Sequence, residues 1–180
     1  MRNRHALLLA PLLLAACSRQ PDQTTETTVA PRIQGNLNQV MRGILFPNSN
    51  VIFDAQDKDP GAPPDPGQAA ANPYAGVYGG WEGYENAAIA LYEAANLVQL
   101  PGRSCQNAKP VPLAEETFRK GLAALREASL YAYKTGQARN KDAIPDVGEK
   151  LAAACATCHD VYRDRVIDGK PMTMEQRCGA

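Results

Sequence analysis

Histidine is scarce in this sequence of 180 residues, in which only His5 and His159 occur. We expect His5 to be lost with an N-terminal leader, so His159 is the only histidine predicted in the mature chain. A Cys₂His₂ zinc site therefore cannot form within one mature chain. No Ser-His-Asp catalytic set is recognisable either.

Basic clusters are also missing. The 19 lysines and arginines are balanced by 19 aspartates and glutamates, and no basic stripe runs along the chain. We therefore expect no nucleic-acid partner. The sequence also has no glycine-rich phosphate-binding loop and no internal repeat, so it lacks the signatures of a P-loop protein or a solenoid.

The apolar run near the N-terminus, Leu7 to Leu14, is too short to cross a bilayer. It follows the basic segment Met1-Arg2-Asn3-Arg4, and the combination predicts a signal peptide over residues 1–16. Its end, Leu14-Ala15-Ala16-Cys17, resembles a bacterial lipobox, which implies that Cys17 is lipidated and becomes the first mature residue. Ordinary cleavage nearby, which would leave Cys17 free, is the alternative.

Residues 17–32 are polar and threonine-rich, so we expect a lipid-anchored flexible tether there. Lipidation of Cys17 implies a membrane anchor on the periplasmic side of a bacterial membrane. Ser18 beside the anchor, rather than Asp, favours the outer membrane over the inner one, by resemblance to enterobacterial lipoproteins. The rest of the mature chain is long enough for one domain, predicted over residues 33–168, with a C-terminal tail at 169–180.

Four segments have apolar residues at helical spacing. The predicted helices cover approximately residues 33–55, 81–100, 112–135 and 142–166. The inward positions predicted on the last three are Tyr84, Ala88, Leu91, Ala95 and Val98; Phe118, Leu122, Leu125, Ser129 and Ala132; and Ile144, Val147, Leu151, Ala154, Cys158 and Tyr162.

Two features interrupt this pattern. Pro47 lacks an N–H, so it predicts a kink or break in the first helix, after which Asn48 and Ser49 could cap a second segment. Residues 57–80 are rich in proline, glycine and alanine and have no helical period. They predict a long loop between the first two helices.

The stretch Cys155-Ala156-Thr157-Cys158-His159 is a C-x-x-C-H motif, the signature of c-type haem attachment. In such a motif the two thiols add to the porphyrin vinyl groups, and the histidine becomes the proximal iron ligand. On a helix the three residues share one face, because positions three and four apart are neighbours. We therefore predict one haem c held by Cys155 and Cys158, with His159 on the iron.

A C-x-x-C pair also occurs in thioredoxin-like redox sites and in half of a zinc site. The redox site requires a βαβ context, which four helical segments do not provide. The Cys₂His₂ zinc site is excluded by the lack of a second mature histidine. Haem attachment is therefore the favoured interpretation.

The motif continues as Asp160-Val161-Tyr162-Arg163, and 21 residues follow His159. Small cytochromes c carry their motif near the N-terminus instead. The layout over residues 33–165 resembles the cytochrome c′ family, in which an aromatic-Arg pair follows C-x-x-C-H. This resemblance implies an all-α, antiparallel four-helix bundle with haem in its core, and places Tyr162 and Arg163 in the haem surroundings.

Cys105 and Cys178 are the cysteines that remain after Cys17, Cys155 and Cys158 are assigned. In an up-down-up-down bundle, the loop between the second and third helices and the end of the fourth helix lie at the same end. An oxidising compartment favours a disulfide between Cys105 and Cys178, and two free thiols are the alternative.

The second axial position of the iron has several candidates. Met41 lies on the first predicted helix at about the height of His159, whereas Met172 and Met174 lie on the predicted tail, outside the core. In the cytochrome c′ family an apolar residue usually covers this position and leaves the iron five-coordinate, but relatives with a methionine there have six-coordinate haem. Two alternatives stay open: Met41 binds the iron, or Val40 or Ile44 covers it without binding.

These expectations favour an exported c-type cytochrome that transfers electrons to redox partner proteins in the periplasm or membrane. The alternative is a five-coordinate haem protein that binds NO or CO. An enzymatic role is disfavoured, because no second mature histidine could act as a distal acid or base. A homodimer stays open.

Overall fold

Residues 30–63 and 79–179 are described by the structure, a computed structural model, and they are mostly helical with one two-stranded sheet. The predictions for residues 1–29, which include the signal peptide, the lipidation of Cys17 and most of the tether, lie outside these ranges. So does the middle of the predicted 57–80 loop, at residues 64–78.

The first helical segment consists of α1 (Leu37–Val40), the π-helical turn η1 (Met41–Leu45) and α2 (Phe46–Asp54). It begins four residues later than predicted, because Asn36 caps it. The Asn36 side chain accepts a hydrogen bond from the Gln39 backbone N–H at 2.9 Å, and the Gln39 side chain accepts one from the Asn36 N–H at 2.9 Å. This reciprocal pair is a capping box, which fixes the start of the helix.

Of the kink or break predicted at Pro47, the break is absent, and the expected capping role of Asn48 and Ser49 is wrong. The helical backbone continues through Pro47 and accommodates it with η1, immediately before it. The side chains of Asn48 and Ser49 donate to the carbonyls of Ile44 and Phe46, at 2.7 and 3.0 Å, instead of accepting backbone N–H groups. The first helix is therefore continuous but contains one widened turn.

Three longer helices follow: α5 (Gly80–Val98), α6 (Glu116–Gln137) and α7 (Ile144–Tyr162), the last preceded by the 3₁₀ turn η2 (Lys141–Ala143). The inward positions predicted from the helical period are confirmed as buried, except Cys158, which is half-buried. The period is a local property of the sequence, so it identifies the apolar face whatever the helix packs against.

The predicted ends of two helices are wrong. The third helix begins at Glu116 and not at Pro112, which lies in the preceding loop. The fourth helix ends at Tyr162, and Val166 belongs instead to strand β1 (Val166–Ile167), which pairs antiparallel with β2 (Lys170–Pro171). The chain therefore departs from the predicted all-α class in this small hairpin.

The turn of the hairpin explains this departure. Asp168 and Gly169 join the two strands and have φ of 50° and 73°. Asp-Gly is a favoured pair for a two-residue hairpin turn with both residues at positive φ. The pair also lies across the predicted boundary at residue 168, so the hairpin joins the predicted domain and the predicted tail.

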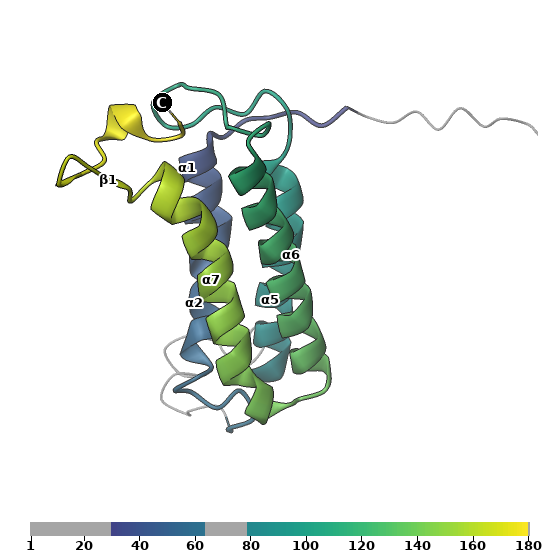
Figure 1. The fold of residues 1–180 in the computed structure, drawn as a ribbon. Coiled ribbons are helices and arrows are strands. Elements are labelled where there is room, and N and C mark those ends of the chain that lie inside the picture. The colour runs from purple at the N-terminus through teal and green to yellow at the C-terminus, as the bar shows by residue number, and fades with distance from the viewer. Residues whose placement is uncertain (1–29, 64–78, 180) are drawn as a thin grey trace, which may run out of the picture. The chain divides into compact units, whose positions relative to one another are not determined.

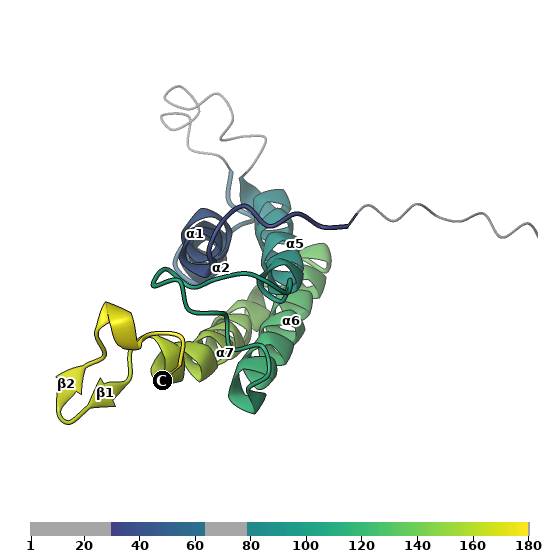
Figure 2. The ribbon, with the colours of Figure 1, turned by 90° about the horizontal axis from the view of Figure 1, so that it is seen from above.

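Successive long helices run in opposite directions and lie side by side (Figure 1). Seen from above, α6 lies between α5 and α7, while α1 and α2 lie beside α5 (Figure 2). The core between them is rich in alanine, and Ala88, Ala94, Ala95 and Ala132 are fully buried. Small side chains let neighbouring helices approach each other closely.

The first and last helices approach each other at one end. Gly148 on α7 lies beside Gln56, just after α2, and a Cβ at Gly148 would come within 2.7 Å of Gln56 Nε2. The start of α1 and the end of α7 lie toward the opposite end (Figure 1), and a cavity separates the two helices there.

The loop between α5 and α6 is fastened to its surroundings by a buried arginine. Arg103 is only 6% exposed and donates to the Leu97 carbonyl at 3.0 and 3.2 Å, and also to the Gly35 carbonyl. One guanidinium therefore links the end of α5 to the segment before α1, and its buried donors are satisfied by backbone carbonyls.

The C-terminal segment packs against the same loop. A disulfide joins Cys105 to Cys178, with their Cα atoms 6.4 Å apart. The Asn107 side-chain amide donates to the carbonyls of Met174, Glu175 and Arg177 at 3.0–3.3 Å. The predicted tail is therefore an ordered part of the domain.

Within residues 30–63 and 79–179, no helix combines the length and the apolar character needed to span a membrane.

Replacing Cys105 and Cys178 together by serine should lower the free energy of unfolding by roughly 4 kcal/mol. The disulfide closes a loop of 73 residues, which restricts the unfolded chain. Urea unfolding without reductant measures the difference. A reductant should destabilise the parent protein by a similar amount and leave the double variant unchanged; equal stability of parent and variant without reductant would contradict the prediction.

Candidate functional site

The three residues of the predicted attachment motif lie in the last two turns of α7. Cys155, Cys158 and His159 are all half-buried, and both cysteines are free thiols. A single helix positions them, so their spacing on one face follows from the helical repeat. The structure therefore presents two thiols and one imidazole together, on the side of α7 that faces the first helix.

A cavity of about 400 Å³ lies between this face of α7 and the first helix. Met41, Arg42 and Leu45 line it from η1, whereas Cys155, Cys158 and His159 line it from α7. Much of the remaining lining is apolar and consists of Phe46, Leu91, Val98, Phe118, Leu122, Leu125 and Ala154.

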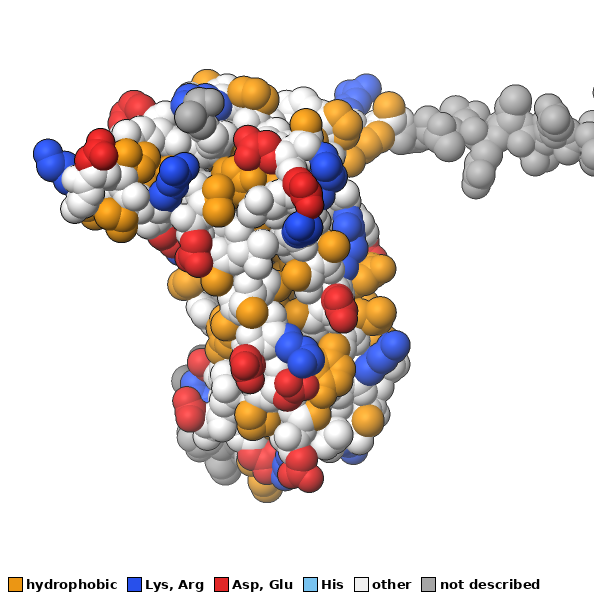
Figure 3. Space-filling view, in the orientation of Figure 1, with side chains coloured by type: hydrophobic (Ala, Val, Ile, Leu, Met, Phe, Trp, Pro, Cys, Tyr) orange, Lys and Arg blue, Asp and Glu red, His pale blue; other side chains and the backbone are white. Residues whose placement is uncertain are grey.

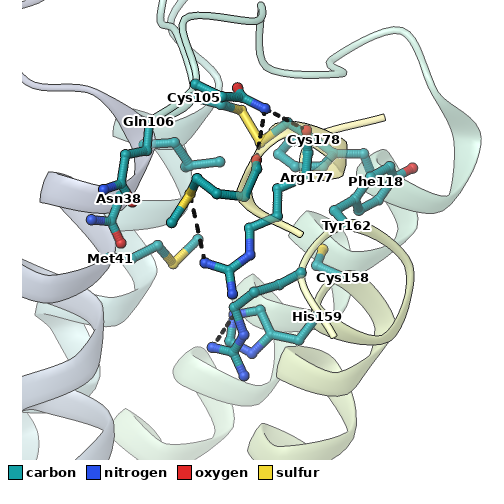
Figure 4. Close-up of a pocket in the computed structure, with 14 residues that line it drawn as sticks. Asn38, Met41, Cys105, Gln106, Phe118, Cys158, His159, Tyr162, Arg177 and Cys178 are labelled. Carbon is teal, nitrogen blue, oxygen red and sulfur yellow. Dashed lines mark hydrogen bonds between the residues drawn. A yellow bond between two sulfur atoms is a disulfide. The ribbon is translucent and has the colours of Figure 1, made fainter. Parts of the chain in front are cut away.

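A smaller cavity, of about 90 Å³, continues from it toward the C-terminal segment. Met41, Cys158 and His159 line both cavities. In Figure 4 the Met41 side chain points into the smaller cavity from the first helix, and His159 lies across from it on α7. The predicted candidate for the second axial position therefore lines the same cavities as the motif histidine, from a different helix.

Val40 and Ile44, the predicted apolar alternatives to Met41, do not line either cavity. Val40 is buried at 8% exposure, in the core and not at the site. Leu45 takes the place expected for Ile44, because the π-turn shifts the face that the helix presents. The sequence signal for this shift is the five-residue spacing between the apolar residues Val40 and Leu45. An α-helical repeat of three or four residues does not produce that spacing.

The prediction that Met172 lies outside the core is wrong, whereas the same prediction for Met174 is confirmed. Met172 is only 8% exposed, whereas Met174, in the 3₁₀ turn η3 (Met174–Gln176), is 36% exposed although it lines the smaller cavity with Met41. Both positions result from the folding of the C-terminal segment back against the loop between α5 and α6, which no local pattern predicts. Met174 is therefore a second thioether near His159.

Gly121 on α6 was not predicted as a site residue, yet it accommodates the motif directly. A Cβ at this position would collide with Cys158 Sγ. A glycine inside a helix costs about 1 kcal/mol relative to alanine, which suggests a packing reason for its presence. Here the reason is the close approach of α6 to the sulfur.

Burial favours the neutral forms of the motif side chains. It raises the pKa of the Cys158 thiol to about 11, with a smaller contribution from Cys155, and it also raises the pKa of Cys155. Burial, together with the positive charge of Arg163, lowers the pKa of His159. Reactive redox cysteines have lowered thiol pKa values, so this pair lacks the electrostatics of a thioredoxin-like site.

The two residues implied by the family resemblance have different surroundings. The Tyr162 hydroxyl donates to Glu115 Oε2 at 2.8 Å, and its ring meets Phe118 edge-to-face with centroids 5.5 Å apart. Burial and this hydrogen bond raise the pKa of Tyr162 to about 12. Tyr162 therefore fixes the end of α7 against α6.

Arg163 is ion-paired with Asp164, and its Nη1 lies 3.4 Å from His159 Nε2. Arg42 and Arg163 line the larger cavity, while Arg163 and Arg177 line the smaller one. Arg177 Nε is buried without a hydrogen-bond partner among the described residues. These three cations are the charged groups that line the two otherwise largely apolar cavities.

Charges elsewhere on the surface form no comparable cluster on the face in view. Figure 3 shows lysines and arginines interspersed with aspartates and glutamates, and the hairpin at 166–171 standing out from the helices. Within the described parts of the chain, no group of three or more His, Cys, Asp or Glu is placed to hold a metal ion by itself.

Comparisons of the chain with protein-family models, with curated proteins and with solved structures found no match.

Gly121→Ala should displace the Cys158 sulfur from its position against α6, because the added methyl group occupies the same space. In haem-free protein we expect the rate of Cys158 alkylation to change several-fold relative to Cys155, which serves as the internal reference. Peptide mass spectrometry after timed alkylation measures the two rates. Since alanine favours helix over glycine, a loss of helicity would not be the cause; an unchanged ratio of rates would contradict the close packing.

Proposed function

We propose that this protein is an exported c-type cytochrome that carries electrons, with one haem covalently held by Cys155 and Cys158. We further propose that its helices form an antiparallel four-helix bundle similar to that of the cytochrome c′ family. The observation that carries the proposal is that Met41 and His159 line the same cavities, with the two motif thiols beside His159.

The residues around the cavity fit such a group. A porphyrin needs a largely apolar space, which the leucines and Phe118 supply. Its linkage needs two thiols on one helix face, and Gly121 leaves room for one of those sulfurs. Its carboxylates need cationic partners, and Arg42, Arg163 and Arg177 line the cavities.

Bound haem would supply an iron atom that takes up and releases one electron. His159 would hold the iron from α7, and Met41 is the proposed ligand from the first helix. A histidine-methionine pair raises the haem potential. The leucines that line the cavity give apolar walls to the space that both side chains border.

The proposed location follows from the N-terminal sequence. A lipid on Cys17 would anchor the protein to the periplasmic side of a bacterial membrane, with the outer membrane favoured, and the polar segment 18–31 would let the domain reach redox partner proteins. The roughly equal numbers of acidic and basic side chains do not favour a nucleic-acid partner. We propose no catalytic role.

Binding of NO or CO is the second candidate function. The apolar lining at Leu45, Leu91 and Leu122 favours it, because a small uncharged gas needs no polar partner. In that case Met41 would be a cavity-lining side chain and not a ligand. The two functions therefore differ in the role of one thioether.

Cys155→Ala and Cys158→Ala should each lower the amount of covalently bound haem in a strain that matures c-type cytochromes, and the double variant should have none. Each change removes one thioether site on α7. Intact mass and retention of pigment after denaturation measure the attachment. The Thr157→Ala variant, inside the motif but lining neither cavity, is the matched control and should keep its haem; an unmodified mass for the parent protein would refute the proposed function.

Met41→Leu should convert a low-spin ferric spectrum into a high-spin one and abolish the weak far-red band of sulfur bound to iron. Leucine keeps the bulk of the side chain but offers no ligand atom. Met174→Leu is the matched control, because Met174 lines the smaller cavity beside Met41. Loss of the band only in Met174→Leu would assign ligation to the C-terminal segment.

A parent protein that is already high-spin and binds CO at once would instead favour gas binding. In that case Met41→Leu should leave the spin state unchanged. Absorption spectra of ferric and ferrous protein, with and without CO, separate the two functions.

A further inference from the structure

The π-turn η1 lies at the place where the first helix meets the cavity. Its N–H of Phe46 bonds to the carbonyl of Met41, five residues earlier, whereas an α-helix would use the carbonyl of Arg42. Such a turn contains one more residue than an α-helical turn, and π-turns are frequent at functional sites. Met41 is its first residue and lines both cavities.

The burial pattern shows what the extra residue does. Val40 and Ile52 are both buried, at 8% and 0% exposure, although they are twelve positions apart. At about 100° per residue, twelve α-helical steps would leave these side chains about 120° apart around the axis. When one residue is absorbed by the π-turn, eleven effective steps leave them only about 20° apart.

Pro47 accounts for the position of the turn. It has no N–H to donate to the Gly43 carbonyl, and its ring would press against that carbonyl in an α-helix. A wider turn before the proline would relieve this contact. Asn48, the next residue, donates from its side chain to the Ile44 carbonyl at 2.7 Å, within the same part of the helix.

We propose that Pro47 is a positioning residue that holds η1 in the π-form and thereby turns the Met41 thioether toward His159. Without the π-turn, the part of the helix before it would rotate by about 100° relative to α2, whose Ile52 anchors it in the core. The Met41 side chain would then leave the face that lines the cavities. Pro47 itself lines neither cavity, so it acts only through the helix.

This inference concerns the axial ligand and so rests on the proposed function, but one of its tests does not require haem. The first variant is Pro47→Ala, which restores the missing N–H. The second adds deletion of Gly43 to Pro47→Ala. Deletion removes the extra residue, so a continuous α-helix would again bring Val40 and Ile52 to one face and return Met41 to the cavity.

In haem-free protein, NMR couplings across hydrogen bonds report the turn directly. The parent should show a coupling from Phe46 N to the Met41 carbonyl carbon, and Pro47→Ala should show it to Arg42 instead. Overhauser contacts from the Met41 methyl group to Phe118, which lines the same cavities, should be lost in Pro47→Ala and recovered in the variant that also lacks Gly43.

In haem-loaded protein the far-red sulfur band should follow the same order: present in the parent, lost in Pro47→Ala and recovered on deletion of Gly43. Loss without recovery, or a deletion variant that does not fold by circular dichroism, would overturn the register argument. A π-turn and Met41 contacts that persist in Pro47→Ala would overturn the role of Pro47. A parent without the band refutes ligation by Met41, and the NMR result then still decides whether Pro47 sets its orientation.

Discussion

The site depends on one packing constraint: α7 must pack along α6 while the face with Cys155, Cys158 and His159 stays uncovered. Contact between Gly148 on α7 and Gln56, just after the first helix, holds the two helices together at one end. At the other end the helices diverge and leave the cavity. Gly121 then lets α6 approach the Cys158 sulfur without filling that space.

The C-terminal segment closes the open end through a few specific bonds. The disulfide to Cys105 and the three hydrogen bonds of the Asn107 amide hold it against the loop between α5 and α6. As a result, Met174 and Arg177 lie beside a cavity that is otherwise lined by the long helices. The segment therefore contributes both a thioether and a cation to the site.

Several features were determined by the sequence alone because they depend on local spacing. The helical period identified the buried faces of α5, α6 and α7, since a repeat near 3.6 residues is set by the helix itself. The same geometry places Cys155, Cys158 and His159 on one face. The hairpin turn at Asp168-Gly169 also had a local signal, and the helical period of the neighbouring residues obscured it.

Other features were decided only by the tertiary structure. The rotation of the first helix depends on the π-turn, which brings Val40 and Ile52 from about 120° to about 20° apart around the axis. The place of Met174 depends on bonds between segments about 70 residues apart. Spacing along the chain determines which residues share one face of a helix. Which faces of two helices meet is determined by their packing, and no local pattern contains that information.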